Sequence, residues 1–242
     1  DIDDENGYFP RYSNKIITEN MFSYQPDSPY ADELQTCIYS NNLNESCSFS
    51  RLPLIGMEKN NPTIDDILDR TLVSHPWMGD RFKQYLESSS VGPDMLRLLR
   101  GVTGIVISYE VRPSFYWAAT GAIYLDANNF WITPLERDTL NEAPDFRTGF
   151  GSDLQFIVPW RYVKNNEYYP AGIYYIADRQ ERSYIDLEAD ISWLMYHELG
   201  HANDFFPPNT WSSLSTSLSP LTAINRSSQI PDSDVLAQQL PL

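Results

Sequence analysis

Two histidines and one glutamate late in the chain have the types and spacing for hydrolytic chemistry. His197 and His201 are four residues apart, and Glu198 follows the first of them. On a helix this spacing puts both imidazoles on one face, about one turn apart, where both can reach one tetrahedral ion. Two neutral imidazoles leave Zn²⁺ cationic, so the ion can lower the pKa of a bound water toward neutrality. Glu198, not itself a ligand, can take that water's proton and pass it to a leaving amine, which describes amide hydrolysis.

The surrounding residues predict the helix that must carry this motif, from about 184 to 206. Apolar residues recur at i, i+4 and i+7 as Leu187, Ile191 and Leu194. Ser183 or Asp186 can cap the N-terminus, and the prolines that begin at Pro207 end the helix. Gly200 costs about 1 kcal/mol relative to alanine inside a helix, so we expect another group to pack closely against it.

The stretch from His197 to Asp204 reads H-E-L-G-H-A-N-D. It resembles the zincin metallopeptidases, and it is similar to the H-E-x-G-H-x-x-D form of the anthrax-lethal-factor family. The resemblance covers this helix alone. It implies a zinc-dependent endopeptidase that cleaves protein or peptide substrates, with His197 and His201 as Zn²⁺ ligands and Glu198 as general base. The alternative is a non-catalytic binding or scaffold protein that keeps a degenerate zincin fold.

A third protein ligand is harder to find. Catalytic zinc takes three protein donors and an open fourth position. Zincins of the glutamate type draw the third donor from a second helix downstream, yet no Glu, His or Tyr follows His201. Asp204 returns to the face of His197 but lies about 10 Å along the helix axis from it. Asp204 is therefore better suited to orient a ligand histidine or to fix the following loop.

Three carboxylates remain as candidates for the third ligand. Asp232 and Asp234 could fold back toward the histidines through a Ser- and Pro-rich connector. The first-ranked candidate is a Glu on polypeptide beyond Leu242, which supposes that this chain stops short of a ligand-bearing helix.

Charge and composition exclude several other classes of function. The 242 residues carry a net charge of −16, with 33 acidic and 17 basic side chains. Such a surplus repels nucleic acid and anionic bilayers, so neither is an expected partner. No apolar run approaches the ~20 residues of a membrane-spanning helix. A hydrophobic share of 42% is enough for a sizeable core.

The two cysteines favour an exported protein, extracellular or periplasmic. Cys37 and Cys47 flank a polar, turn-forming stretch and could close a small disulfide loop. Cytosolic proteins seldom keep such a bridge. The alternative is two unrelated thiols.

We expect an α+β fold, zincin-like, in which a small mixed sheet packs on the long active-site helix and further helices precede it. Residues 1–60 read as an irregular arm with the cysteine pair, 61–206 as the catalytic domain, and 207–242 as a Ser- and Pro-rich tail or connector. The helical part of the domain covers 61–100, and the sheet and active-site helix cover 101–206.

Local patterns predict the individual elements. Helices are expected at 63–74, 76–86, 93–99 and from Thr133, and extended segments at 102–109, 115–117, 121–125, 154–163 and 172–177. The strand at 122–125 could be the edge on which zincins lay an extended substrate, or an ordinary half-buried strand. His75, at a predicted helix end where a positive imidazole suits the dipole, is expected to be structural.

Overall fold

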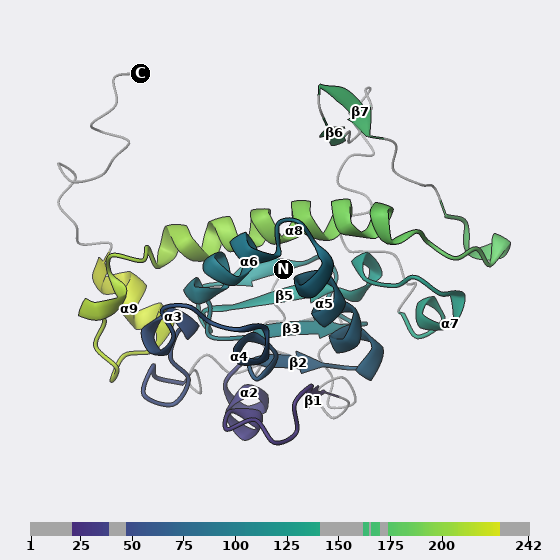
Figure 1. Ribbon diagram of the computed structural model, residues 1–242. Coiled ribbons are helices and arrows are strands. Elements are labelled where there is room, and N and C mark those ends of the chain that lie inside the picture. Colours follow the sequence, from purple (N-terminus) through teal and green to yellow (C-terminus); the bar gives the residue numbers. More distant parts are fainter. Residues whose placement is uncertain (1–20, 39–46, 141–161, 165, 170–173, 228–242) are drawn as a thin grey trace, which may run out of the picture.

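The computed structural model of the chain describes residues 21–38, 47–140, 162–164, 166–169 and 174–227. They form a mixed α+β fold, as the sequence predicts, in which helices flank a five-stranded sheet (Figure 1). A separate two-stranded sheet consists of β6 (Tyr162–Lys164) and β7 (Glu167–Tyr169). Within the described part of the chain, no helix combines the length and apolar character needed to cross a membrane.

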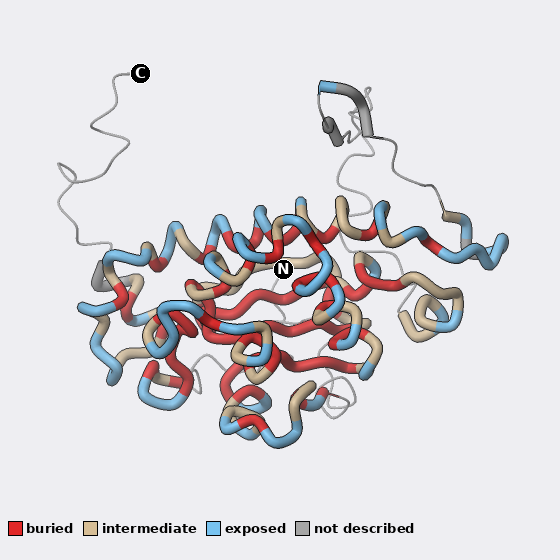
Figure 2. The backbone as a smooth tube through the Cα atoms, viewed as in Figure 1, coloured by how far each residue is buried: buried red, intermediate tan, exposed pale blue. Residues whose placement is uncertain are grey.

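The five-stranded sheet has a parallel centre and antiparallel edges. Its strand order is β1 (Phe22–Ser23), β2 (Thr71–Val73), β3 (Ile105–Ser108), β5 (Ala122–Asp126) and β4 (Phe115–Trp117). β2, β3 and β5 run parallel, with Leu72 opposite Val106 and Val106 opposite Tyr124. β1 and β4 are antiparallel to their neighbours. The central strands are buried on both faces, which their continuous apolar runs require (Figure 2).

The helices group before, between and after these strands. They are α2 (Ala31–Cys37), α3 (Ile55–Glu58), α4 (Ile64–Leu68), α5 (Pro76–Ser88), α6 (Gly92–Leu98), α7 (Pro134–Arg137), α8 (Tyr184–Phe205) and α9 (Pro220–Ser227). Short 3₁₀ turns are η2 (Leu99–Gly101), η3 (Ala127–Asn129), η4 (Ile176–Asp178) and η5 (Trp211–Ser213). Because α5 and α6 connect β2 to the parallel strand β3, this part of the chain is a β-α-β crossover. Elsewhere the helices and strands mostly follow one another in groups.

The alternating side chains of the strands supply two separate cores. One face packs against α4, α5, α6 and α8, and its strand residues are Val73, Ile105, Ile107, Ile123 and Leu125. The other face packs against α2 and against Ile38 and Leu52, and its strand residues are Leu72, Val106, Ala122 and Tyr124. Cys37 and Cys47 belong to this second core and form the predicted disulfide.

A third apolar cluster joins the segment that follows α8 to the early part of the chain. Phe206 and Trp211 pack with Phe49 and Leu54. The backbone N–H of Phe49 donates to the carbonyl of Leu218 at 2.9 Å. The chain after α8 is therefore fastened to residues near the start of the described structure.

Two predicted elements are wrong. The expected helix at 63–74 ends at Leu68, and Thr71–Val73 forms β2 instead. Strand pairing with β1 and β3 buries Leu72 completely and overrides the helical period. No strand occupies the described part of 172–177, because Ile176–Asp178 is a 3₁₀ turn. Of the extended stretch at 154–163, residues 154–161 lie outside the described residues.

Two predicted positions also differ from the structure. The strand at 122–125 is not an edge, because β5 lies between β3 and β4 and is buried. His75 is the N-cap of α5 and so stands at the start of a helix rather than at the C-terminal end of one. The helix dipole at that position disfavours a positive imidazole. Burial lowers the pKa of His75, and its ring contacts Tyr109 edge-on at 5.6 Å between centroids. The expected structural role of His75 stays a prediction, but the reason given for it, a positive imidazole favoured by the helix dipole, does not apply at this position.

Candidate metal centre

The long helix α8 carries the motif and packs against β4 and β5 (Figure 1). Its N-cap is Ser183, whose hydroxyl accepts from the backbone N–H of Asp186 at 3.2 Å. Its C-terminus is Phe205, two residues before the first proline. One face is buried and consists of Leu187, Ile191, Leu194, Met195, Glu198, Leu199 and Ala202. The apolar period expected from the sequence is therefore the face that fixes the helix on the sheet.

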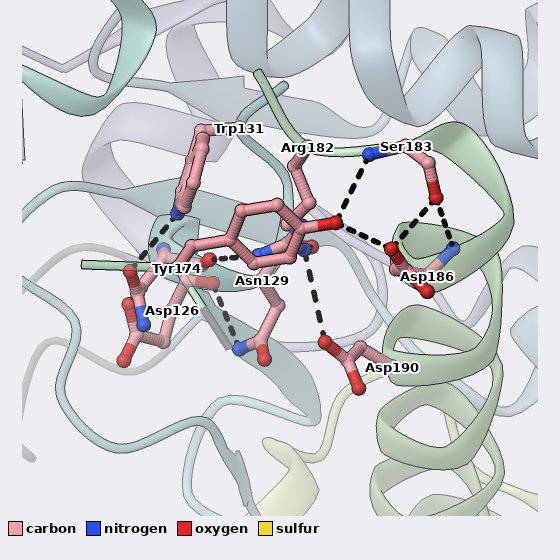
Figure 3. Close-up of polar contacts among 9 residues, drawn as sticks. Asp126, Asn129, Trp131, Tyr174, Arg182, Ser183, Asp186 and Asp190 are labelled. Carbon is pink, nitrogen blue, oxygen red and sulfur yellow. Dashed lines mark hydrogen bonds and ion pairs between the residues drawn. The ribbon is translucent and has the colours of Figure 1, made fainter. Parts of the chain in front are cut away.

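Arg182 ties the start of α8 to η3, the turn that follows β5 (Figure 3). Its guanidinium donates to the carbonyl oxygens of Asn128 at 3.2 Å and Asn129 at 2.7 Å, and it lies over the ring of Trp131. The residue is 8% exposed. Burial lowers the pKa of Arg182, and the carboxylate of Asp190, 3.8 Å away, opposes that shift. No local sequence pattern signals this anchor, because its partners are about fifty residues earlier.

A second set of contacts closes around the same helix start. The Tyr174 hydroxyl donates to the Asp186 carboxylate, and the Ser183 hydroxyl donates to the same oxygen at 2.7 Å (Figure 3). The ring of Tyr174 meets Trp131 edge-on, with 5.7 Å between centroids. Together with Arg182, these contacts set where α8 begins and so where its later turns lie.

The two histidines of the motif converge on a common point. Their Nε2 atoms are 3.3 Å apart, and the rings are nearly perpendicular at 89°. Two imidazole nitrogens that share a tetrahedral Zn²⁺ at 2.0–2.1 Å are separated by about 3.3–3.4 Å. Both side chains are exposed among the described residues, so an ion can reach them. His197 and His201 thus fit two of the ligand positions of a zinc ion.

Glu198 lies beside the histidines, on the side that faces the core. Around the helix it is about 100° from His197 and about 60° from His201. Its residue is only 5% exposed, whereas the histidines are open. The arrangement provides two imidazole nitrogens and a shielded carboxylate next to them.

The structure does not bring the remaining predicted site residues to this pair. Asp204 is exposed on α8, and no hydrogen bond in the described structure links it to His197 or His201. Asp232 and Asp234 lie outside the described residues. Across the ranges that the structure describes, no three His, Cys, Asp or Glu residues lie close enough to hold one metal ion.

Close packing at Gly200, expected from its cost inside a helix, is wrong for the described structure. A methyl group at this position would meet nothing within 4 Å. The position is exposed, so the glycine leaves open space on the outer side of the helix.

Trp193 is a neighbour of the site that the sequence patterns did not single out. Its ring stacks on that of His197, with 5.5 Å between centroids and 17° between planes. The sequence contained a signal for this contact, because Trp193 and His197 are four residues apart on a predicted helix and side chains at i and i+4 meet.

No protein-family model matches the chain, and neither a curated protein nor a solved structure does. The chemistry of the site therefore follows from the side chains on α8 and their immediate neighbours.

Proposed function

We propose that the protein is a zinc-dependent metalloendopeptidase of the zincin type. His197 and His201 would hold the ion, and Glu198 would serve as general base. The observation that carries the proposal is the 3.3 Å separation of the two Nε2 atoms, which equals the ligand–ligand distance of tetrahedral zinc, on an exposed helix face beside a buried glutamate.

The roles of the zinc ion and of Glu198 in this proposal follow from these positions. When bound, zinc would supply a Lewis acid that activates water toward a peptide carbonyl. Glu198 would accept the proton of the attacking water and deliver it to the leaving amine. Glu198 is only 5% exposed, so its carboxylate is largely shielded from bulk solvent. The third donor would be a carboxylate, and the candidates within this chain are Asp232 and Asp234.

The alternative is a non-catalytic protein that keeps the helix but not the reaction. One observation favours it, namely that the residues described here bring no third donor to the two histidines. The two readings differ in zinc content and in the effect of replacing Glu198, so one set of variants separates them.

The test uses the full chain as purified. We expect about one zinc per chain by elemental analysis and cleavage of casein or of a peptide library. Glu198→Gln should keep the zinc and lower cleavage by about 10²–10⁴-fold, the usual contribution of a general base. His197→Ala and His201→Ala should lose both zinc and activity.

Glu188→Gln is the matched control, because Glu188 is another glutamate on α8 whose carboxylate accepts from the backbone of Ser90 at 3.3 Å, away from the motif. This variant should behave like the wild type. Wild-type protein without stoichiometric zinc, or unchanged cleavage by Glu198→Gln, would refute the peptidase and leave the non-catalytic alternative.

We also infer that the protein acts outside the cytosol on polypeptide substrates. The Cys37–Cys47 disulfide supports an oxidising compartment. The net charge of −16 argues against nucleic acid as a partner. Localisation of the natural protein by cell fractionation tests this inference, and a purely cytosolic distribution would contradict it.

A further inference from the structure

Three aromatic rings follow one another along the exposed side of α8. Trp193, His197 and His201 stand at i, i+4 and i+8. The first two rings are stacked, and the last two are perpendicular with 4.8 Å between centroids. The plane of the His197 ring is therefore set on one side by the indole, while its Nε2 atom faces His201 on the other.

Burial in the core does not account for the indole of Trp193. The residue is 41% exposed, although the face of α8 that packs on the sheet is almost completely buried. Its ring instead lies stacked on that of His197, a candidate ligand.

We propose that Trp193 is a positioning residue for the metal-binding pair, and the inference rests on the proposed function. The χ2 torsion of histidine is broad, so an exposed imidazole turns easily and its Nε2 samples many directions. Stacking on the indole restricts that rotation before an ion arrives, which lowers the entropic cost of binding. An imidazole that shares the charge of a cation is also attracted by the face of a tryptophan ring.

Three single variants test this role. Trp193→Leu removes the aromatic face, and Trp193→Phe keeps one. Tyr196→Leu is the matched control, because Tyr196 is on the same helix, is 43% exposed and adjoins His197 in sequence. The ring contacts of the structure pair His197 with Trp193 and His201 but not with Tyr196.

The first measurement is the affinity of each full-length variant for Zn²⁺, by competition with a chromophoric chelator. We expect Trp193→Leu to weaken Zn²⁺ binding by about five-fold, within the range of an aromatic pair. Trp193→Phe should recover most of the loss, and Tyr196→Leu should bind like the wild type. Far-UV circular dichroism confirms that each variant keeps its helices.

The second measurement reports the stack without a metal. The ring protons of His197 in the metal-free protein should resonate upfield because of the indole ring current, and Trp193→Leu should abolish that shift in the NMR spectrum. Unshifted ring protons in the wild type would overturn the inference by themselves.

The outcomes distinguish the two proposals. A wild type that binds no zinc overturns both. A wild type that binds zinc while Trp193→Leu binds it equally well overturns only the positioning role. An equal loss in Tyr196→Leu also overturns it, because the effect would then belong to the helix surface in general.

Discussion

Gly200→Ala should stabilise the protein, although the glycine lies inside the metal-binding motif. A methyl group there meets nothing within 4 Å among the described residues, and the position is exposed. Steric clash therefore adds nothing to the change in the free energy of unfolding, which depends only on the helix propensities of glycine and alanine. Alanine is favoured over glycine by about 0.8–1.0 kcal/mol in a helix interior. We expect the free energy of unfolding to rise by about that amount, and Tm by about 2–4 °C for a chain of this size.

Gly56→Ala is the matched substitution with the opposite sign. Gly56 is also helical, in α3, but a Cβ atom there would lie 2.2 Å from Cζ3 of Trp211. The indole is a rigid ring that is 7% exposed, so it has little room to move away. Forcing an extra methyl group into a packed core costs about 1–3 kcal/mol, which outweighs the gain in helix preference.

Urea unfolding followed by far-UV circular dichroism measures both variants. We expect a higher midpoint for Gly200→Ala and a lower one for Gly56→Ala, with unchanged slopes. Lower stability of Gly200→Ala would refute the reasoning, because it would mean that another group packs against the outer side of α8. Weaker Zn²⁺ binding by that variant would point to the same conclusion.

Three other expectations concern the stability of the fold. Arg182→Met should lower the free energy of unfolding by about 2–4 kcal/mol, because two carbonyl oxygens at η3 lose a charged donor; a loss below about 0.5 kcal/mol in urea unfolding would contradict this. Burial raises the pKa of Asp66, but bonds from Thr63 and the ion pair with Lys59 more than offset it, so the net pKa is lowered. The wild type should therefore be more stable than Asp66→Asn above the unfolded carboxyl pKa of about 3.9, and the difference should vanish as pH falls through the lower folded pKa; a difference independent of pH in urea unfolding would contradict it. Opening the Cys37–Cys47 bridge, whose cysteines are ten residues apart, should lower the free energy of unfolding by about 3 kcal/mol by the loop-closure model. Protein that is isolated without reductant and then denatured should show no free thiol until it is reduced.

Local sequence signals were enough to predict α8 and several other elements. Ser183 caps α8, and the capping box at Thr63 starts a helix. Thr133 does the same for α7. These signals involve residues three or four apart, so they are legible in one stretch of sequence. The His197–His201 pair belongs to the same class, because both residues lie on one helix.

Features that depend on distant partners were not predictable in this way. Thr71–Val73 fits a helical pattern, and only its pairing with β1 and β3 makes it a strand. The anchoring of Arg182 on η3 and the open space at Gly200 likewise follow from how α8 is placed on the sheet. A third metal donor is a property of tertiary structure for the same reason, so the motif predicts two ligands and not the complete set.

The order in which the main core is assembled has a consequence for synthesis of the protein. Its sheet strands are complete at Asp126, but the helix that covers part of one face begins only at Tyr184. At 5–20 residues per second, a ribosome needs roughly 3–12 seconds to make the intervening chain. During that interval the apolar side chains at Ile123 and Leu125 lack their α8 partners. A nascent chain stalled before α8 therefore exposes apolar surface on one face of the sheet. Chaperones that bind exposed hydrophobic surfaces should associate with it until the helix emerges.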